Sequence, residues 1–316
     1  MRGLPVTARA RLGAGPVAAL LALALGGCGL GAGPAPTAVQ LVVTRDFGAR
    51  VLRQSGAPRV NGQETVMSLL MRNDNVSTRF SGGFVQSIDG LAGGREGGRP
   101  VDWFYYVNGE QAGMGGAATN VHPGDHIWWD RHDWSQTEDI PAVVGSFPEP
   151  FLNGIDGKRL PVRIECADVG GYACRTVTAR LRATGVPAAI AAIGGGGGTE
   201  TLRVMVGPWV NVQGDIATES VVRGPRASGV YARFAADGRT LTLLDRDGRA
   251  TRTLRAGSGL IAATRHGEDA PVWVVTGTDA GGADLAARAF DAAVLRNRFA
   301  VALTPAGAVP LPQEGP

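Results

Sequence analysis

The residues best suited to ligand binding are aromatic and lie in one short stretch. Aromatic residues make up only 6% of the 316-residue chain, yet they crowd the region between positions 103 and 134. Strand alternation would place Trp103 and Tyr105 on one face and Tyr106 on the other, and would separate Trp128 from Trp129 in the same way. A single helix covers one face of a small sheet, so the second face would offer its rings to a flat, apolar ligand. Alternatively, that face packs against the domain that follows.

Histidine and aspartate side chains alternate along the last part of this stretch. His126, Trp128, Asp130 and His132 would share one face of a strand. Two imidazoles and a carboxylate could bind a metal ion. No partner ligands are evident elsewhere in the sequence, so we expect solvated histidines at a sheet edge and no metal site.

Catalytic motifs are missing from the sequence. It contains neither Gly-x-Ser-x-Gly nor His-Glu-x-x-His. The glycine run Gly194–Gly198 lacks the Lys-Ser/Thr of a phosphate loop, so we interpret it as a flexible loop. We therefore expect a binding protein that is not an enzyme and that requires no cofactor.

The first 27 residues have the anatomy of a secretory signal. Basic residues at the start are followed by the apolar run Val17–Leu25, which is too short to span a bilayer. The ending Leu25-Gly26-Gly27-Cys28 resembles the lipobox of bacterial lipoproteins. That resemblance implies lipidation of Cys28 and anchoring at the extracytoplasmic face of the cell membrane. The alternative is an ordinary signal peptide with an incidental cysteine.

The remaining two cysteines form a close pair. The chain has three cysteines, so lipidation of Cys28 leaves Cys166 and Cys174. An exported chain meets an oxidising compartment, which favours a disulfide between them. Two free thiols or a metal-binding pair is the alternative.

The charge of the chain gives no support to a nucleic-acid partner. Three of the 31 basic residues, Arg2, Arg9 and Arg11, belong to the signal, which has no acidic residue. The rest of the chain therefore balances 28 basic against 28 acidic residues. A neutral protein gives no indication of nucleic-acid binding.

The elements that would position these residues form two domains. Residues 28–36 are rich in Gly, Ala and Pro and predict a flexible tether. Residues 37–134 read as a strand, a helix and then several strands, which predicts an α+β domain. Residues 135–159 predict a linker, residues 160–304 a second α+β domain, and residues 305–316 a flexible tail.

Three motifs in the first domain resemble a known family. They are the helix Thr65–Leu70, the strand and turn Trp103–Gly109, and the segment Pro123–Trp129. Together they are similar to the transcobalamin-like C-terminal domain, also called the domain of unknown function 4430. The resemblance implies a β-grasp-like domain and a cobalamin or another corrinoid as ligand.

These observations lead to two functional hypotheses. The first is a membrane-anchored lipoprotein that binds a small ligand for an uptake system, with a transporter membrane subunit as its partner. The second is an envelope module that binds peptidoglycan, another glycan or a protein. The segment Leu202–Trp209, which is faintly similar to the peptidoglycan-binding SPOR domain, nominates Trp209 for that second role.

Overall fold

The computed structural model describes residues 35–194 and 199–314, all within one compact unit. The predicted signal, Cys28, nearly all of the predicted tether and most of the glycine run lie outside the described residues. Among the described residues, no helix is both long and apolar enough to cross a membrane. We call residues 35–134 the N-terminal half, residues 135–159 the connecting segment and residues 160–314 the C-terminal half.

The described chain is a mixture of helices and strands, consistent with the α+β class. The N-terminal half forms β1 (Gln40–Arg45), β2 (Arg50–Ser55), α1 (Val66–Asn73), β3 (Val76–Arg79), η1 (Phe80–Gly82), β4 (Phe84–Ile88), β5 (Leu91–Ala92), β6 (Gly94–Glu96), β7 (Arg99–Val107), β8 (Glu110–Gln111) and β9 (His126–Asp133). The C-terminal half forms β10 (Val162–Cys166), α2 (Tyr172–Ala183), β11 (Ala189–Ala192), β12 (Leu202–Pro208), α3 (Trp209–Val212), η2 (Ile216–Thr218), α4 (Glu219–Arg223), α5 (Pro225–Ser228), β13 (Ala232–Phe234), β14 (Leu241–Leu244), β15 (Ala250–Leu254), β16 (Gly259–Thr264), β17 (Val272–Gly277), α6 (Ala280–Arg288), α7 (Ala292–Leu295), β18 (Ala300–Thr304) and β19 (Gly307–Leu311).

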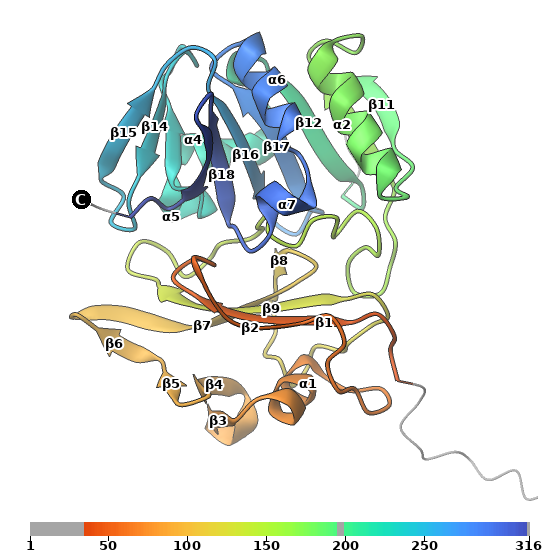
Figure 1. Cartoon of the computed structure of the whole chain (residues 1–316), viewed down its shortest axis with the longest axis vertical. Helices are drawn as coiled ribbons and strands as arrows, with labels where there is room; N and C mark the ends of the chain where they lie inside the picture. The colour runs from red at the N-terminus through yellow and green to blue at the C-terminus, as the bar shows by residue number, and fades with distance from the viewer. Residues whose placement is uncertain (1–34, 195–198, 315–316) are drawn as a thin grey trace, which may run out of the picture. The chain divides into compact units, whose positions relative to one another are not determined.

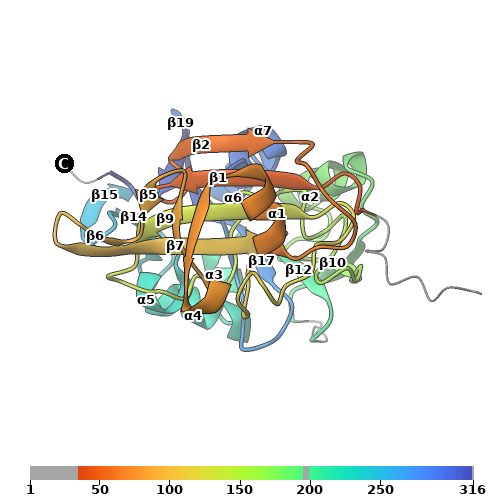
Figure 2. The same ribbon diagram turned by 90° about the horizontal axis from the view of Figure 1, so that it is seen from below.

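A six-stranded sheet with one helix on its face makes up most of the N-terminal half. Its order is β2-β1-β9-β7-β6, and β8 pairs with β7. β1 runs parallel to β9, with Leu41 opposite Ile127, whereas the other neighbours are antiparallel. α1 begins after Thr65, whose side chain accepts a hydrogen bond from the backbone N–H of Ser68. α1 lies across one face of the sheet in the view from below (Figure 2), and its apolar side chains share a core with those of β1, β7 and β9.

The C-terminal half is built on a seven-stranded mixed sheet. Its order is β11-β10-β12-β17-β16-β18-β19, parallel from β11 to β17 and antiparallel beyond. α2 and α6 lie side by side on one face (Figure 1). β16 and β17 are buried along their whole length, which requires cover on both faces.

The N-terminal half covers the face of the C-terminal sheet that lies opposite α2 and α6. One hydrophobic core contains Val42 and Trp128 of the N-terminal sheet together with Tyr231 and Phe299 of the C-terminal half. The rings of Trp128 and Phe299 meet edge to face, 5.2 Å apart. Both faces of the N-terminal sheet are therefore covered, one by α1 and the other by the C-terminal half.

The structure departs from the sequence prediction at two segments. The predicted linker is packed into the protein, because Val143, Val144, Phe147 and Phe151 are buried. Apolar side chains between the prolines of this segment explain the difference. The predicted flexible tail contains β19, which pairs with β18 along Gly307–Leu311.

Candidate functional site

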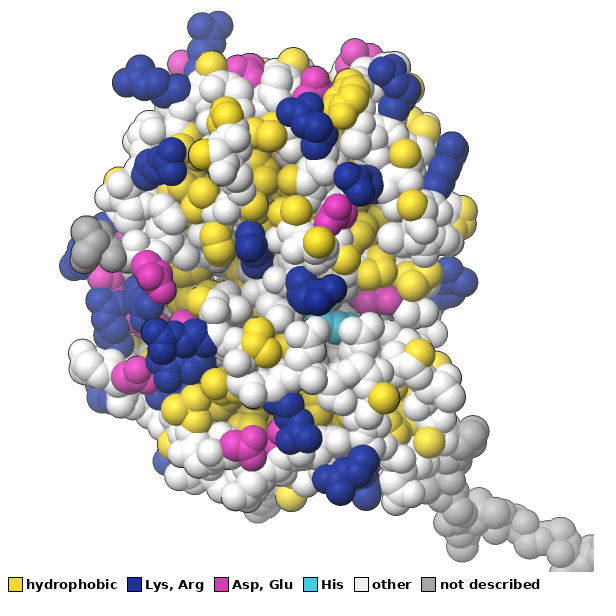
Figure 3. Space-filling view, viewed as in Figure 1, with side chains coloured by type: hydrophobic (Ala, Val, Ile, Leu, Met, Phe, Trp, Pro, Cys, Tyr) yellow, Lys and Arg dark blue, Asp and Glu magenta, His cyan; other side chains and the backbone are white. Residues whose placement is uncertain are grey.

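A cavity of about 650 Å³ opens beside the start of β9. It lies where the first residues of β1 and β9 meet the connecting segment and the end of α7. Its polar lining includes His126, Ser146, Glu149, Asn153 and Arg296. On the face of the molecule that carries α7, Figure 3 shows basic side chains (dark blue) above a histidine (cyan). This cavity is the candidate site because several polar groups converge in it.

Two glycines let the chain close around this cavity. Gly124 has a φ of +83°, and a Cβ there would meet the side chain of Asn153 at 2.5 Å. A Cβ on Gly145 would lie 2.6 Å from the backbone nitrogen of Arg298 and equally close to the ring of Trp128. The turn before β9 and the connecting segment can approach so closely only because these positions lack a side chain.

Ser146 and His126 form a hydrogen-bonded pair in the cavity wall. The hydroxyl of Ser146 lies 2.9 Å from Nδ1 of His126, and both residues are buried. Burial lowers the pKa of His126 from 6.5 to about 4. The imidazole is therefore neutral at physiological pH and adds no positive charge to the site.

Glu149 supplies a buried carboxyl group to the same wall. Its two oxygens accept hydrogen bonds from the backbone N–H and the side-chain amide of Asn153. Burial raises the pKa of Glu149 from 4.5 to about 7, and the charge of Asp125 acts in the same direction. The hydrogen bonds from Asn153 lower this pKa, but they do not outweigh burial. The carboxyl group is therefore close to half ionised at neutral pH.

A second hollow, of about 540 Å³, has a different electrostatic character. It is lined by Glu110, Arg265 and Met114, among others. Glu110 forms an ion pair with Arg265, so its charge is already compensated within the protein. The cavity beside His126 holds no such compensation for Glu149 among the described residues.

The five aromatic residues predicted to bind a ligand are divided between two faces. Trp103, Tyr105 and Trp129 face α1 in the core of the N-terminal half. Tyr106 and Trp128 face the C-terminal half and are fully buried there. An open aromatic shelf is not formed, because the C-terminal half covers the second face.

Part of this aromatic set borders a smaller hollow. Trp103, Tyr105 and Trp129 line a pocket of about 150 Å³, with Phe84 and Met114 at its rim. These three are the predicted ligand residues that a small molecule could still approach from outside.

The expectation of solvated histidines at a sheet edge is wrong. β9 lies between β1 and β7, so His126 and His132 are buried in the middle of the sheet. Among the described residues, no group of three or more His, Cys, Asp or Glu side chains is placed to hold a metal ion.

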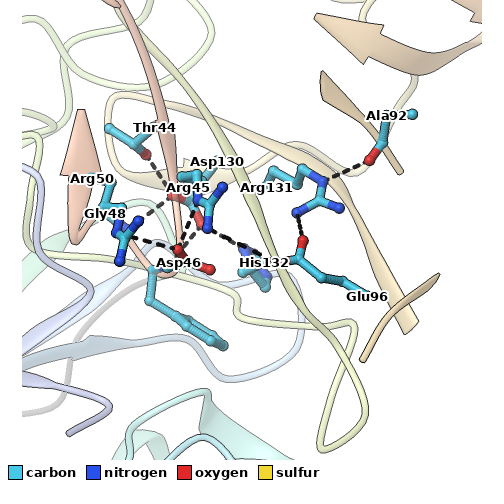
Figure 4. A network of polar contacts seen from close by, with 11 residues as sticks. Thr44, Arg45, Asp46, Gly48, Arg50, Ala92, Glu96, Asp130, Arg131 and His132 are labelled. Atoms are coloured by element: carbon cyan, nitrogen blue, oxygen red, sulfur yellow. Dashed lines mark hydrogen bonds and ion pairs between the residues drawn. The ribbon is translucent and has the colours of Figure 1, made fainter. Parts of the chain in front are cut away.

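Asp130 organises a buried network beside His132. Its carboxylate accepts hydrogen bonds from Nδ1 of His132 at 2.8 Å and from the backbone N–H of Gly48 at 2.9 Å, as well as from the hydroxyl of Thr44 (Figure 4). The His132 ring is stacked between Phe47 and a second phenylalanine, Phe104. These contacts fix the turn after β1. Asp130 and His132 therefore stabilise the fold and do not line the cavity.

Two further sequence predictions have a definite outcome. Cys166 and Cys174 form a disulfide that joins the end of β10 to the first turn of α2. Trp209 is buried and stacked on Phe234 at 4.5 Å. It is therefore part of the core and presents no ring to a glycan.

The residues that sequence reasoning missed come from the predicted linker and from α7. The Pro and Gly residues of the connecting segment predicted a linker, so its polar residues Ser146, Glu149 and Asn153 were not considered as site residues. Phe147 and Phe151 among these polar residues could have indicated a packed segment, because a solvent-exposed linker rarely contains large apolar side chains. Nothing in the sequence pointed to Arg296.

Comparison with known proteins identifies one region of the chain. Residues 63–133 match the family model of a domain of unknown function, DUF4430. The DUF4430 region runs from just before α1 to the end of β9 and so contains His126. It does not reach the connecting segment or the C-terminal half. No curated protein matches the chain, and no solved structure does.

Proposed function

We propose that this protein is a lipid-anchored, extracytoplasmic binding protein that holds a small polar ligand in the cavity beside His126, and that it is not an enzyme. The observation that carries the proposal is the convergence of His126, Ser146 and Glu149 on one cavity. Its volume falls within the range of about 300 to 1,000 Å³ that is usual for small-ligand sites. The hydrogen bonds of these side chains hold them in place before a ligand arrives.

The anchor and the partner belong to the same proposal. Leu25-Gly26-Gly27-Cys28 supports lipidation of Cys28 at the outer face of the cell membrane. A binding protein held at that surface would deliver its ligand to a transporter membrane subunit.

We also propose a β-grasp-like, transcobalamin-like character for residues 37–134. The parallel pairing of β1 with β9 and the packing of α1 on one face of the sheet support it. The family resemblance makes a corrinoid the first ligand to test. A corrinoid would have to be held by the cavity, since the aromatic face is covered.

The site can be tested by blocking it. Gln54 is exposed on β2 and lines the cavity, whereas Leu52 is exposed on the same strand and does not line it. We expect Gln54→Trp to abolish binding and Leu52→Trp to preserve it. Equilibrium dialysis with cobalamin and cobinamide, and thermal shift with a panel of small polar metabolites, would provide the measurements. Binding that both variants retain would place the ligand elsewhere and contradict the proposal.

The anchor has a separate test. Metabolic labelling with palmitate should mark the wild-type protein in cells, and Cys28→Ser should lose the label and leave the membrane fraction. Cys166 and Cys174 provide the control, because their disulfide withholds both thiols from acylation. Labelling that survives Cys28→Ser would overturn the anchor.

A further inference from the structure

The chemistry of the cavity narrows the class of ligand, given the binding function proposed above. Glu149 is only 4% exposed, and the hydrogen-bond donors to its carboxylate are the backbone N–H and side-chain amide of Asn153 and the backbone N–H of Leu152, all neutral groups. Each carboxylate oxygen has a second lone pair, so the group can accept further hydrogen bonds. No Lys, Arg or His side chain forms an ion pair with it in the described part of the chain. A buried carboxylate without a countercharge is costly unless a ligand supplies one.

The groups that face Glu149 do not supply positive charge. His126, on β9, is neutral, and its partner Ser146 carries no charge. Asp125, in the turn before β9, adds negative potential. An ammonium group would thus enter a site that is negative at its inner wall, and it would form a charge-assisted hydrogen bond there.

Arg296 gives the cavity a second, opposite pole. It follows α7, lines the cavity and is exposed. Within residues 35–194 and 199–314 it has no ion pair. A guanidinium binds a carboxylate through two parallel hydrogen bonds and repels a second cation. The cavity is therefore unsuited to polyamines and suited to a molecule that carries both charges.

We propose that the cavity beside His126 takes a zwitterion of the amino-acid or short-peptide class, with its ammonium group against Glu149 and its carboxylate against Arg296. Ser146, which lines the same cavity, can accept or donate a further hydrogen bond to such a ligand.

The proposal has a consequence for pH. An ammonium group binds the ionised carboxylate of Glu149. In the fraction of protein molecules whose Glu149 is protonated, ligand binding near neutral pH therefore releases the Glu149 proton to the solvent. Affinity should therefore fall as the pH drops below about 7, where Glu149 is protonated. His126, whose pKa is lowered to about 4 by burial, stays neutral through this pH range and does not contribute to the change.

The test compares three chemical forms of the same compound. The standard L-amino acids and the di- and tripeptides of alanine are screened by thermal shift, and the best binder is compared with its N-acetyl and C-amide forms by calorimetry. We expect each blocked form to bind about ten-fold or more weakly, the loss of one charge-assisted contact. An N-acetyl form that binds as tightly as the free amine would overturn the proposal.

Two variants assign the poles. Glu149→Gln should remove the preference for the free amine, and Arg296→Gln should remove the preference for the free carboxylate. Glu110→Gln, in the second hollow, is the matched control and should change neither. Proton release by the wild type, measured by calorimetry in buffers of different ionisation enthalpy, tests the role of Glu149 even if Glu149→Gln folds poorly. Absence of proton release would count against the proposal.

The outcomes also separate this inference from the proposed function. If no amino acid or peptide binds but another ligand binds and is blocked by Gln54→Trp, the zwitterion is wrong and the binding site stands. If no ligand is blocked by Gln54→Trp, both fail.

Discussion

Burial acts in opposite directions on two side chains that share one cavity. The pKa of Glu149 rises from 4.5 to about 7, so the folded state binds this proton more tightly than the unfolded chain. Its contribution to stability is complete below pH 4.5 and is lost as the pH rises towards 7. The pKa of His126 falls from 6.5 to about 4, so its contribution is complete above pH 6.5 and is lost as the pH falls towards 4. Between these values the two effects oppose each other.

Single substitutions should separate the effects of Glu149 and His126 on how the unfolding free energy depends on pH. We expect the unfolding free energy of the wild type to change little between pH 4.5 and 6.5 on account of this pair. Glu149→Gln should lose stability as the pH falls through that window, and His126→Asn should lose it as the pH rises, by at most about 1.4 kcal/mol per pH unit. Denaturant unfolding at a series of pH values measures both. The double variant is the control, and a slope that it shares with either single variant would contradict this explanation.

Asp130 should be the most sensitive position in the buried network. Asp130→Ala removes the acceptor of Thr44, Gly48 and His132 at once and leaves buried donors unsatisfied. We expect a loss of about 3 kcal/mol or more of unfolding free energy. Asp284→Ala, a partly exposed position on α6, should change it by less than about 0.5 kcal/mol. A similar, small effect of both substitutions would show that the network does not stabilise the turn after β1.

Among the elements, the disulfide ties a strand to the helix that covers it. Cys166 and Cys174 are eight positions apart, so the loop that they close is short. Replacing both by Ala should lower the unfolding free energy by about 2 to 3 kcal/mol. A reductant should lower the melting temperature of the wild type and leave that of the double variant unchanged. Equal sensitivity of the two proteins to reductant would contradict this prediction.

Elements with a clear hydrophobic pattern could be predicted from the sequence. Continuous apolar runs between turns are typical of buried strands, and they predict strands over Gly259–Thr264 and Val272–Gly277, which are the bounds of β16 and β17. The spacing of Val66, Leu69 and Leu70 on one face predicts a helix where α1 is found. The sequence also predicts one amphipathic helix over residues 283–295, but the structure has two helices, α6 and α7, because Asp291 caps the start of α7.

Other elements carry no such local signal. β2 is exposed along most of its length, so its residues show no alternation, and it exists because β1 offers it a partner. β19 contains Pro310 and is held by pairing with β18. The cavity likewise has no local sequence signal, because it forms where β1, β9, the connecting segment and α7 meet, and these segments are far apart in the sequence. Only His126 of its polar lining lay within a motif that could be recognised.

At the scale of the whole molecule, the two halves depend on each other. Val42, Tyr106 and Trp128 share a hydrophobic core with side chains of the C-terminal half, such as Phe299. We expect the full chain to unfold in one cooperative transition, and a fragment of residues 37–134 to show none and to bind a hydrophobic dye. Calorimetry and dye fluorescence would check this. A fragment that unfolds cooperatively by itself would show that the N-terminal sheet needs no cover.

Thr37, at the border of the cavity, lies nine positions after Cys28. Even a fully extended chain of that length spans no more than about 30 Å. In the lipid-anchored protein that we propose, the mouth of the cavity is therefore confined to a layer about as thick as the bilayer core itself. With such an anchor, a ligand would be released within this distance of the membrane. The protein itself would search for its membrane partner in two dimensions and not in three.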